Sequence, residues 1–478
     1  MLFNAYFSSV FNVAKHIDVT QNNKEAESFI INTKDIRNKL YSLQNKKSVG
    51  PDSIPVEMLK LGGEAVIPFL VRLLEITINN GTVPTDWKKA TVVPIFKGGC
   101  RADISNYRPV SLTSVVSKIM EYVITKYIRE TWEKTNWLSE KQHGFRPGYS
   151  CDSQLVTVCQ DLADSLDTGE RIDAIVIDFS KAFDLVPHDR LLFKISNSGL
   201  DSRILAWIKD FLTGRTQKVR IQQELSNDVQ VTSGIPQGSV IGPLLFLAFI
   251  NDIEINMQST IRLFADDCII YKVIRSEGDE KTLQSDLDKL WEWASINSMK
   301  INPQKSKSIS FTKSRIKQSL AYSLGGNSIV EVNSCKYLGI TIKNDLNWID
   351  HVNITTKKGW RALNFVMRTL KKGNNNAKKL AYTSLVRPIL EYGVACWDPY
   401  RKCQVKALDR IQNKALKFAG EGRGENCNWE SLENRRKLAR LCAMFKTKNI
   451  LCFVFVIYVF VYVILFCPAT GCEAQLRE

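Results

Sequence analysis

The chain has few of the residues that usually hold a zinc ion or a disulfide framework. Its 478 residues include only four histidines, and its twelve cysteines are scattered without a single Cys-x-x-Cys pair. This spacing argues against a structural zinc site and against a framework of paired cysteines. The N-terminus lacks the basic region and the small-residue cleavage site of a secretory signal, and no internal repeat is evident. A reducing compartment therefore fits the sequence best.

The composition describes a globular chain with a basic surface. The formal net charge is +16 and 44% of the residues are hydrophobic. Because the chain has 478 residues, it should fold into more than one compact unit. Basic residues gather in two segments, 299–318 and 357–379. Such charge suits a polyanion such as nucleic acid, although solvated surface lysines would give the same composition.

A pair of neighbouring carboxylates, Asp266 and Asp267, is the most informative feature of the sequence. Apolar residues flank the pair in the segment 262–271, which predicts two strands joined by a tight turn. Two like charges at close range raise each other's pKa, so a divalent cation would explain the arrangement. A solvated turn is the alternative, because Asp is a common turn residue.

A third carboxylate, Asp178, stands at the end of another predicted strand. Residues 174–177 form a short apolar run rich in β-branched side chains, which is typical of a buried strand. Carboxylates on a strand end and on a hairpin suit two Mg²⁺ ions, with Mn²⁺ as an alternative. Two such ions about 3.5–4 Å apart can activate an attacking oxygen and stabilise the leaving one in phosphoryl transfer. Alone, Asp178 would more often be a helix N-cap.

A glycine-rich loop lies between the acidic segments. Gly234, Pro236 and Gly238 prevent regular structure there, and the apolar run that follows is long enough for a buried helix. Glycine lets the backbone approach a ligand closely, and Gln237 offers an amide that both donates and accepts hydrogen bonds. In this order and at these spacings, the loop and the acidic segments together are strong evidence of one functional site.

The ordered motifs resemble the reverse transcriptases of non-LTR (LINE-type) retrotransposons, closest to the jockey and chicken-repeat-like groups. Two segments resemble the fingers motifs of that family, Asn-Tyr-Arg-Pro-Val-Ser-Leu (106–112) and Gln-His-Gly-Phe-Arg-Pro-Gly-Tyr-Ser (142–150). Three resemble its palm motifs, Asp-Phe-Ser-Lys-Ala-Phe-Asp (178–184), Gly-Ile-Pro-Gln-Gly-Ser (234–239) and Phe-Ala-Asp-Asp (264–267). Two more follow where the palm continues, Asn-Pro-Gln-Lys-Ser-Lys (302–307) and Cys-Lys-Tyr-Leu-Gly-Ile (335–340).

The resemblance implies an α+β fold, a right-hand polymerase with fingers and an antiparallel palm sheet followed by an all-α thumb. It places a helical lead-in at 1–45, fingers at 46–165, the palm at 166–345, the thumb at 346–448 and an apolar tail at 449–478. The residue patterns themselves predict helices over 55–79 and 112–131, a strand over 91–97, and helical character from about 350. The expected activity is DNA synthesis on an RNA template from a DNA primer, with dNTPs as substrates.

The same resemblance assigns the metal ligands and the nucleotide pocket. Asp178 and Asp266 would bridge the metals, and Asp267 would complete the cluster. Phe183 matches the aromatic steric gate that leaves no room for a ribose 2′-OH, although without the motif it would be interpreted as a core anchor of a short helix. Two residues of the glycine-rich loop would line the nucleotide pocket, Gln237 and Gly238.

Basic and hairpin residues are the candidates for contacts to nucleic acid. Lys97 and Arg108 are expected to contact the triphosphate, because an arginine fork holds phosphate oxygens bidentately and lysine acts as a point charge. Either could instead be a surface cation. Lys305 could protonate the pyrophosphate leaving group as a general acid. A solvated lysine or a contact to a phosphate backbone is the alternative. The resemblance also implies template contact by Arg146 and a primer grip made by Tyr337, Leu338 and Gly339.

The chain departs from the family at both ends. Met1 starts directly in sequence that resembles the stretch just before the fingers, so the endonuclease function is expected from a separate source. Residues 450–467 are eighteen residues without a charge, just long enough to be a transmembrane candidate. Translation of a T-rich stretch beyond the original frame of the element is the favoured interpretation, and a membrane span is the alternative.

Competing functions share parts of these observations. A catalytically decayed or domesticated copy would keep the fold and act only as an RNA-binding protein. A membrane-anchored protein is supported by the tail alone, and an RNA-templated RNA polymerase is disfavoured by Phe183. As a retrotransposon enzyme, the protein is expected in a nuclear and cytoplasmic ribonucleoprotein.

Overall fold

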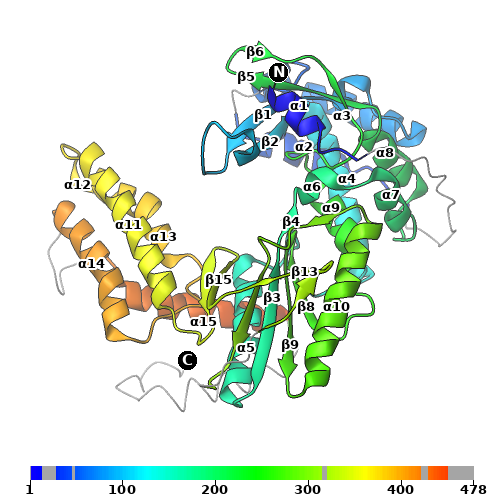
Figure 1. Cartoon of the computed structure of the whole chain (residues 1–478). Helices are drawn as coiled ribbons and strands as arrows, with labels where there is room; N and C mark the ends of the chain where they lie inside the picture. Colours follow the sequence, from blue (N-terminus) through cyan, green and yellow to red (C-terminus); the bar gives the residue numbers. More distant parts are fainter. Residues whose placement is uncertain (1, 13–27, 46–48, 315–319, 421–428, 451–478) are drawn as a thin grey trace, which may run out of the picture. The chain divides into compact units, whose positions relative to one another are not determined.

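The chain divides into two compact units (Figure 1). The computed structural model describes residues 2–12, 28–45, 49–314, 320–420 and 429–450. The first unit comprises Met1–Phe145, Ala174–Ser308 and Ser319–Glu331, and the second comprises Arg146–Asp173, Ile309–Gln318 and Val332–Glu478. The first unit combines residues of the predicted fingers and palm, and the second combines residues of the predicted fingers, palm and thumb. The boundaries of those domains remain a prediction.

A five-stranded sheet carries the acidic segments. Its order is β14-β11-β3-β9-β8, with β3 (Arg171–Ile177), β8 (Thr260–Phe264), β9 (Asp267–Ile274), β11 (Lys307–Phe311) and β14 (Val330–Glu331). β8 and β9 form the predicted antiparallel hairpin, in which Phe264 pairs with Asp267. β11 and β14 run parallel, so the sheet is mixed and not wholly antiparallel as expected. Parallel pairing needs a crossover, and the hairpin of β12 (Ser323–Leu324) and β13 (Asn327–Ser328) lies within it.

Two helices build the core beside these strands. α10 (Glu277–Ile296) packs against β9, and Leu283, Leu287 and Leu290 repeat at helical spacing on its buried face. α9 (Gly242–Ile250) is buried from residue 244 to residue 250, which confirms the predicted apolar helix after the glycine-rich loop. Each fully buried leucine contributes about 1.5–3 kcal/mol. This packing holds the strand ends and the glycine-rich loop in one place.

A second sheet supplies basic side chains to the first unit. Its order is β2-β1-β5-β6, with β7 also paired to β5. β1 runs antiparallel to β2 and parallel to β5. The strands are β1 (Lys89–Phe96), β2 (Tyr107–Leu112), β5 (Arg215–Ile221), β6 (Glu224–Leu225) and β7 (Val229–Val231). β1 confirms the strand predicted over 91–97.

The remaining helices of the first unit surround the two sheets. α3 (Val56–Asn80) and α4 (Val115–Lys134) confirm the helices predicted over 55–79 and 112–131. α3 is two helices in series, because Gly63 interrupts it with a φ of 50°. The others are α1 (Leu2–Ser8), α2 (Thr33–Ser42), α6 (Ala182–Leu185), α7 (His188–Ser196) and α8 (Ser202–Leu212).

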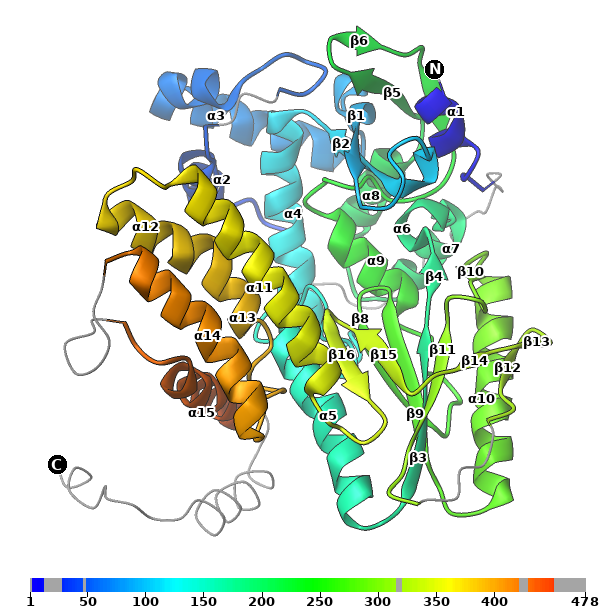
Figure 2. The same cartoon turned by 60° about the vertical axis from the view of Figure 1, so that its left-hand side comes forward.

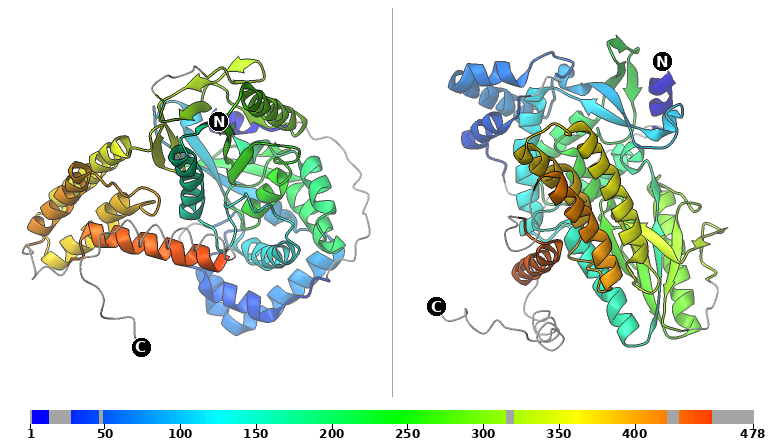
Figure 3. Two further views of the ribbon diagram at one scale, coloured as in Figure 1. Left: turned by 90° about the horizontal axis from the view of Figure 1, so that it is seen from below. Right: turned by 90° about the vertical axis from the view of Figure 1, so that its left-hand side faces the viewer.

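The second unit is mainly helical. It contains α5 (Cys151–Asp167), α11 (Ile349–Thr369), α12 (Asn375–Ala381), the π-helix η3 (Tyr382–Val386), α13 (Arg387–Glu391), α14 (Lys402–Phe418) and α15 (Leu432–Ile450), with one hairpin of β15 (Ser334–Tyr337) and β16 (Ile340–Lys343). α11 and α14 lie side by side (Figures 2 and 3), so the helical character predicted from about 350 is confirmed. The Sγ atoms of Cys159 and Cys396 lie 2.9 Å apart in this unit.

The apolar tail falls almost wholly outside the part of the chain that the structure describes. Within 450–467, only Ile450 is described, as the last residue of α15. Among the described helices, none has the length and apolar character to cross a membrane. The prediction for the tail is therefore untested by the structure.

Candidate active site

Three carboxylates line one cleft of the first unit. Asp178 follows the last residue of β3, and Asp266 and Asp267 lie where β8 turns into β9, the neighbour of β3. Burial raises the pKa of Asp178 and of Asp266, and the charge of Asp178 raises the pKa of Asp266 further. Neighbouring carboxylates do not readily ionise together in such a place. A divalent cation that binds their oxygen atoms would stabilise the ionised form of both. Among the described residues, no three or more His, Cys, Asp or Glu side chains are already gathered around a metal position.

The loop at 302–306 fixes the backbone of Asp178. The Asn302 N–H donates to the Asp178 carbonyl at 2.9 Å, and the Asp178 N–H donates to Ser306 Oγ at 3.2 Å. Buried Ser306 in turn donates to the Asn302 carbonyl at 2.9 Å. The same loop carries Lys305, whose ammonium favours the ionised form of Asp178. The predicted general acid therefore lies near a predicted metal ligand.

Gln142 holds the turn that presents Asp266. Ala265 has a φ of 55°, an uncommon backbone conformation for a residue with a Cβ. Buried Gln142 accepts hydrogen bonds at Oε1 from the N–H groups of Ala265, at 2.9 Å, and Gly144, at 2.8 Å. A Cβ on Gly144 would lie 2.4 Å from the Ala265 nitrogen, so only glycine permits this approach. Sequence reasoning gave Gln142 no role, because the contact joins segments 123 residues apart.

Basic side chains line the same cleft, which has a volume of about 720 Å³. Lys97 follows β1 and Arg108 lies on β2, and the pairing of these antiparallel strands places the two near each other. Desolvation lowers the pKa of Lys97, and the charge of Arg108 lowers it further. Both cations favour the ionised form of Asp266. The cleft therefore combines carboxylates that suit a cation with basic side chains that suit an anion.

Phe183 lies in the cleft on an aromatic support. Its ring stacks on buried Phe246, with centroids 4.2 Å apart and planes at 17°, and meets Phe145 edge-on at 6.4 Å. Phe183 is only partly buried, so one part of the ring packs while another part faces the cleft. The packing and gating interpretations of Phe183 are thus compatible.

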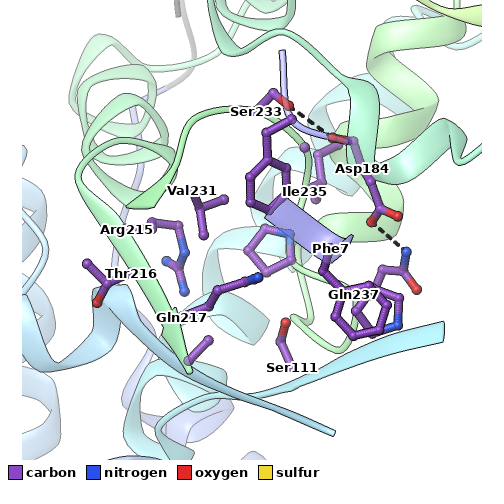
Figure 4. Close-up of a pocket in the computed structure, with 15 residues that line it drawn as sticks. Phe7, Ser111, Asp184, Arg215, Thr216, Gln217, Val231, Ser233, Ile235 and Gln237 are labelled. Carbon is purple, nitrogen blue, oxygen red and sulfur yellow. Dashed lines mark hydrogen bonds between the residues drawn. The ribbon is translucent and has the colours of Figure 1, made fainter. Parts of the chain in front are cut away.

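Gln237 and Gly238 are held between β2 and the segment of Asp184. The Ser111 N–H donates to the Gln237 carbonyl at 2.7 Å, and the Gln237 Nε2 donates to Asp184 Oδ1 at 2.7 Å (Figure 4). Gly238 has a φ of 113°, and a Cβ there would lie 2.7 Å from the Ser111 carbonyl oxygen. Asp184 was not singled out from the sequence, although it closes the motif at 178–184.

The N-terminal helix α1 forms another part of the cleft lining, which sequence reasoning missed. Tyr6, Phe7 and Val10 line the cleft, and the Lys181 ammonium lies 4.0 Å from the centroid of the Tyr6 ring. Asn12 anchors the end of this segment, because its N–H donates to Ser233 Oγ at 2.8 Å. The apolar spacing of residues 2–11 was the available signal, but it did not show which surface the helix covers.

The predicted template and primer residues belong to the second unit. The Arg146 guanidinium lies over the Tyr149 ring at 4.9 Å. The Tyr337 hydroxyl accepts a hydrogen bond from Gln154 Nε2 at 3.0 Å, and the Leu338 carbonyl accepts one from Tyr392 at 2.9 Å. Leu338 and Gly339 form the β15–β16 turn with φ values of 44° and 86°. Their relation to nucleic acid remains a prediction.

Comparison with known proteins identifies one family, over a range that includes most of the cleft residues. A family model described as reverse transcriptase (RNA-dependent DNA polymerase) matches residues 93–342, just over half of the chain. This range contains every predicted site residue of both units. A solved structure of apo telomerase from Candida tropicalis, truncated from the C-terminal domain, covers 55% of this chain and 54% of its own, at 12% identity and a TM-score of 0.39.

Three Drosophila melanogaster proteins are similar over most of the chain. The probable RNA-directed DNA polymerase from transposon BS is 28% identical over 401 residues, covering 81% of this chain and 44% of that protein. The corresponding protein from transposon X-element is 27% identical, covering 80% and 43%. The RNA-directed DNA polymerase from mobile element jockey is 26% identical, covering 81% and 43%. The chain spans less than half the length of these relatives.

Proposed function

The chain belongs to the reverse transcriptase (RNA-dependent DNA polymerase) family, among the jockey-like enzymes of non-LTR retrotransposons, and on this premise we propose that it extends a DNA primer on an RNA template. The substrates would be dNTPs, and the reaction would be nucleotidyl transfer with divalent metal ions. The proposal rests on one observation, the shared cleft. Asp178 and Asp266 line this cleft together with Lys97, Arg108 and the other residues predicted to bind the metal ions and the nucleotide.

The cleft residues have distinct roles in this proposal. Asp178, Asp266 and Asp267 would hold Mg²⁺ or Mn²⁺, which would activate the primer 3′-oxygen and stabilise the leaving oxygen. Lys97 and Arg108 would bind the triphosphate, because their charges lie near the carboxylates that would hold the metal ions.

The remaining cleft residues would select and orient the nucleotide. Phe183 would exclude a ribose 2′-OH by its partly buried ring, and Gln237 would contact the nucleotide beside it. Lys305 is placed near Asp178, where it could donate a proton to pyrophosphate. Arg146 and the turn at Tyr337, Leu338 and Gly339 would contact template and primer.

Primer extension by the full chain tests the proposal. The assay supplies an RNA template, an annealed DNA primer, dNTPs and Mg²⁺. Asp178→Asn and Asp266→Asn should each abolish extension while primer–template binding persists, because basic contacts to phosphates supply most of that affinity. Asp86→Asn is the matched control, since Asp86 is an exposed carboxylate of the same unit that pairs only with Lys89 among the ion pairs of the described residues.

The outcomes separate the candidate functions. Extension by wild type and by Asp86→Asn, but by neither cleft variant, supports the polymerase assignment. Substantial extension by a cleft variant at saturating Mg²⁺ contradicts the metal-ligand assignment. RNA binding without extension by the wild-type chain would instead support a copy that only binds RNA.

A further inference from the structure

We infer that Asp184 is a positioning residue of the nucleotide pocket, whose carboxylate fixes the direction in which the Gln237 amide meets the incoming nucleotide. The inference rests on the proposed function and extends it to a residue that does not itself have to touch the substrate. Asp184 and Gln237 both line the cleft, and both also line a smaller cavity (Figure 4).

The direction of the amide follows from one hydrogen bond. Gln237 Nε2 donates to Asp184 Oδ1 at 2.7 Å, a short bond of the charge-assisted kind. An ionised carboxylate only accepts hydrogen bonds, so the amide nitrogen must face it and the carbonyl Oε1 must be directed elsewhere. Rotation of the amide by half a turn would place two acceptors against each other. The nucleotide would therefore always meet the Gln237 amide with its nitrogen and its oxygen in the same positions.

The backbone keeps the two partners in register. The Ile235 N–H donates to the Phe183 carbonyl at 2.9 Å, and the Gly234 N–H donates to the Val186 carbonyl at 2.8 Å. Ser233 Oγ donates to the Asp184 carbonyl at 3.0 Å. Gly234 has a φ of 83°, and a Cβ on it would lie 2.6 Å from the Asp184 carbonyl oxygen. The glycine-rich loop thus lies directly on the segment that carries Phe183 and Asp184.

Two ammonium groups favour the ionised form of Asp184, against the effect of its burial. Burial raises the pKa of Asp184 above its ordinary value, and the hydrogen bond from Gln237 and the ammonium groups of Lys181 and Lys97 oppose that rise. His188 lies behind the loop, where its Nε2 is 2.8 Å from the Gly234 carbonyl oxygen. Two cations therefore face the carboxylate from the cleft side, where the triphosphate would also lie.

A kinetic cycle tests the inference in the full chain. Asp184→Asn keeps the shape of the side chain but presents either a donor or an acceptor, so the Gln237 amide loses its fixed direction. We expect the KM for dNTP to rise about tenfold, the value of one charge-assisted hydrogen bond, while kcat changes less than about threefold. Gln237→Ala should raise KM to a similar extent. The double variant should be no worse than Gln237→Ala, because Asp184 acts through Gln237.

A second pair of substitutions covers the case in which Asp184→Asn does not fold. In the double variant Asp184→Asn/Gln237→Glu, the new amide donates a hydrogen bond and the new carboxylate accepts it. The hydrogen bond is thus restored in the reverse direction, so thermal stability should recover. The nucleotide would then meet a carboxylate, so the KM for dNTP should stay raised about tenfold or more. Recovery of KM together with stability would overturn the inference and leave Asp184 as a structural link between two loops.

The remaining outcomes distinguish this inference from the proposed function. If the wild-type chain does not extend a primer, the proposed function fails and the inference falls with it. If wild type extends but Asp184→Asn leaves the KM for dNTP unchanged, or if the two single effects add in the double variant, only the inference is overturned.

Discussion

The side-chain oxygen of Gln142 accepts a hydrogen bond of 2.9 Å from the backbone nitrogen of Ala265, the residue that directly precedes the acidic pair. This bond stabilises a left-handed backbone at Ala265, which costs about 1–2 kcal/mol for a residue other than glycine. The position of Asp266 therefore depends on a residue outside the hairpin.

Loss of the Gln142 amide should slow catalysis more than it weakens nucleotide binding. Gln142→Leu leaves two buried N–H groups without their acceptor, which costs about 1–3 kcal/mol of stability. We expect kcat to fall about tenfold or more, because Asp266 moves. The KM for dNTP should change little, because Lys97 and Arg108 stay in place. Combining Gln142→Leu with Ala265→Gly should restore stability in part. An unchanged kcat in Gln142→Leu would show that the turn holds without this contact.

Phe183→Val should admit ribonucleotides. The smaller side chain leaves space beneath the sugar, and loss of the stack on Phe246 should lower the free energy of unfolding by about 1–3 kcal/mol. The measurement is the ratio of kcat/KM for dNTP to that for rNTP. Phe246→Leu is the control, since it weakens the same stack and leaves the Phe183 ring in place. If the ratio moves equally in both variants, Phe183 acts by packing alone.

Tyr6 lies outside the family match at 93–342, and its contact with Lys181 should contribute to nucleotide binding. Tyr6→Leu removes the ring face, and the cation–π interaction is worth about 0.5–1 kcal/mol. We expect the KM for dNTP to rise about two- to fivefold, as that energy implies. Tyr6→Phe keeps the ring and should match wild type. Equal behaviour of Phe and Leu at this position would exclude the cation–π contact as the cause.

Without a metal ion, the wild-type protein should be less stable at neutral pH than a variant in which one cleft carboxylate is replaced by an amide. Burial raises the folded-state pKa of Asp178 and Asp266 above the unfolded value. Their contribution to stability is thus fully present below the unfolded pKa and is lost as pH rises through the raised folded pKa. Asp266→Asn should therefore raise Tm in EDTA at about pH 8, and the difference should close as the pH falls toward about 4.

Mg²⁺ gives the complementary measurement. It should raise the Tm of wild type by binding the folded state, and should raise that of Asp266→Asn much less. Asp86→Asn should respond to Mg²⁺ as wild type does, because Asp86 is exposed and lies outside the cleft lining. An equal Mg²⁺ response in all three proteins would contradict a metal role for Asp266.

Deletion of 449–478 should leave extension activity unchanged and improve solubility. The tail contains an apolar, aromatic run of eighteen residues without a charge, which is an aggregation hazard in water. Fractionation of full-length and truncated protein, with a detergent step, checks this expectation. Recovery of only the full-length chain in the detergent-soluble membrane fraction would instead support a membrane-inserted tail.

The sequence predicted elements whose signals are local. The hairpin at Asp266, the strand before Asp178 and the helix after Gly238 each follow from hydrophobic pattern and glycine placement within about ten residues. The structure brings nine of the predicted site residues into one cleft: Lys97, Arg108, Asp178, Phe183, Gln237, Gly238, Asp266, Asp267 and Lys305.

The missed residues depend on contacts between distant segments. Asp184 meets Gln237 across 53 residues, and Gln142 meets Ala265 across 123. Nothing in the local pattern distinguishes a glutamine that holds a turn from one in solvent, since both are polar and uncharged. The parallel pairing of β11 with β14 was missed for the same reason, because strand direction depends on the connection and not on the strand sequence.

The touching thiols of Cys159 and Cys396 make the second unit a two-electron reductant that needs little movement to react. Hydrogen peroxide could accept the two electrons and both protons and become two water molecules, leaving a disulfide bond between α5 and the segment after α13. The hydrogen bond from one thiol to the other, together with burial, raises the pKa of Cys396, so the reactive thiolate is scarce and mild oxidants should act slowly. Purified protein should accordingly keep these thiols through brief exposure to air and lose them on long storage unless a reductant is present.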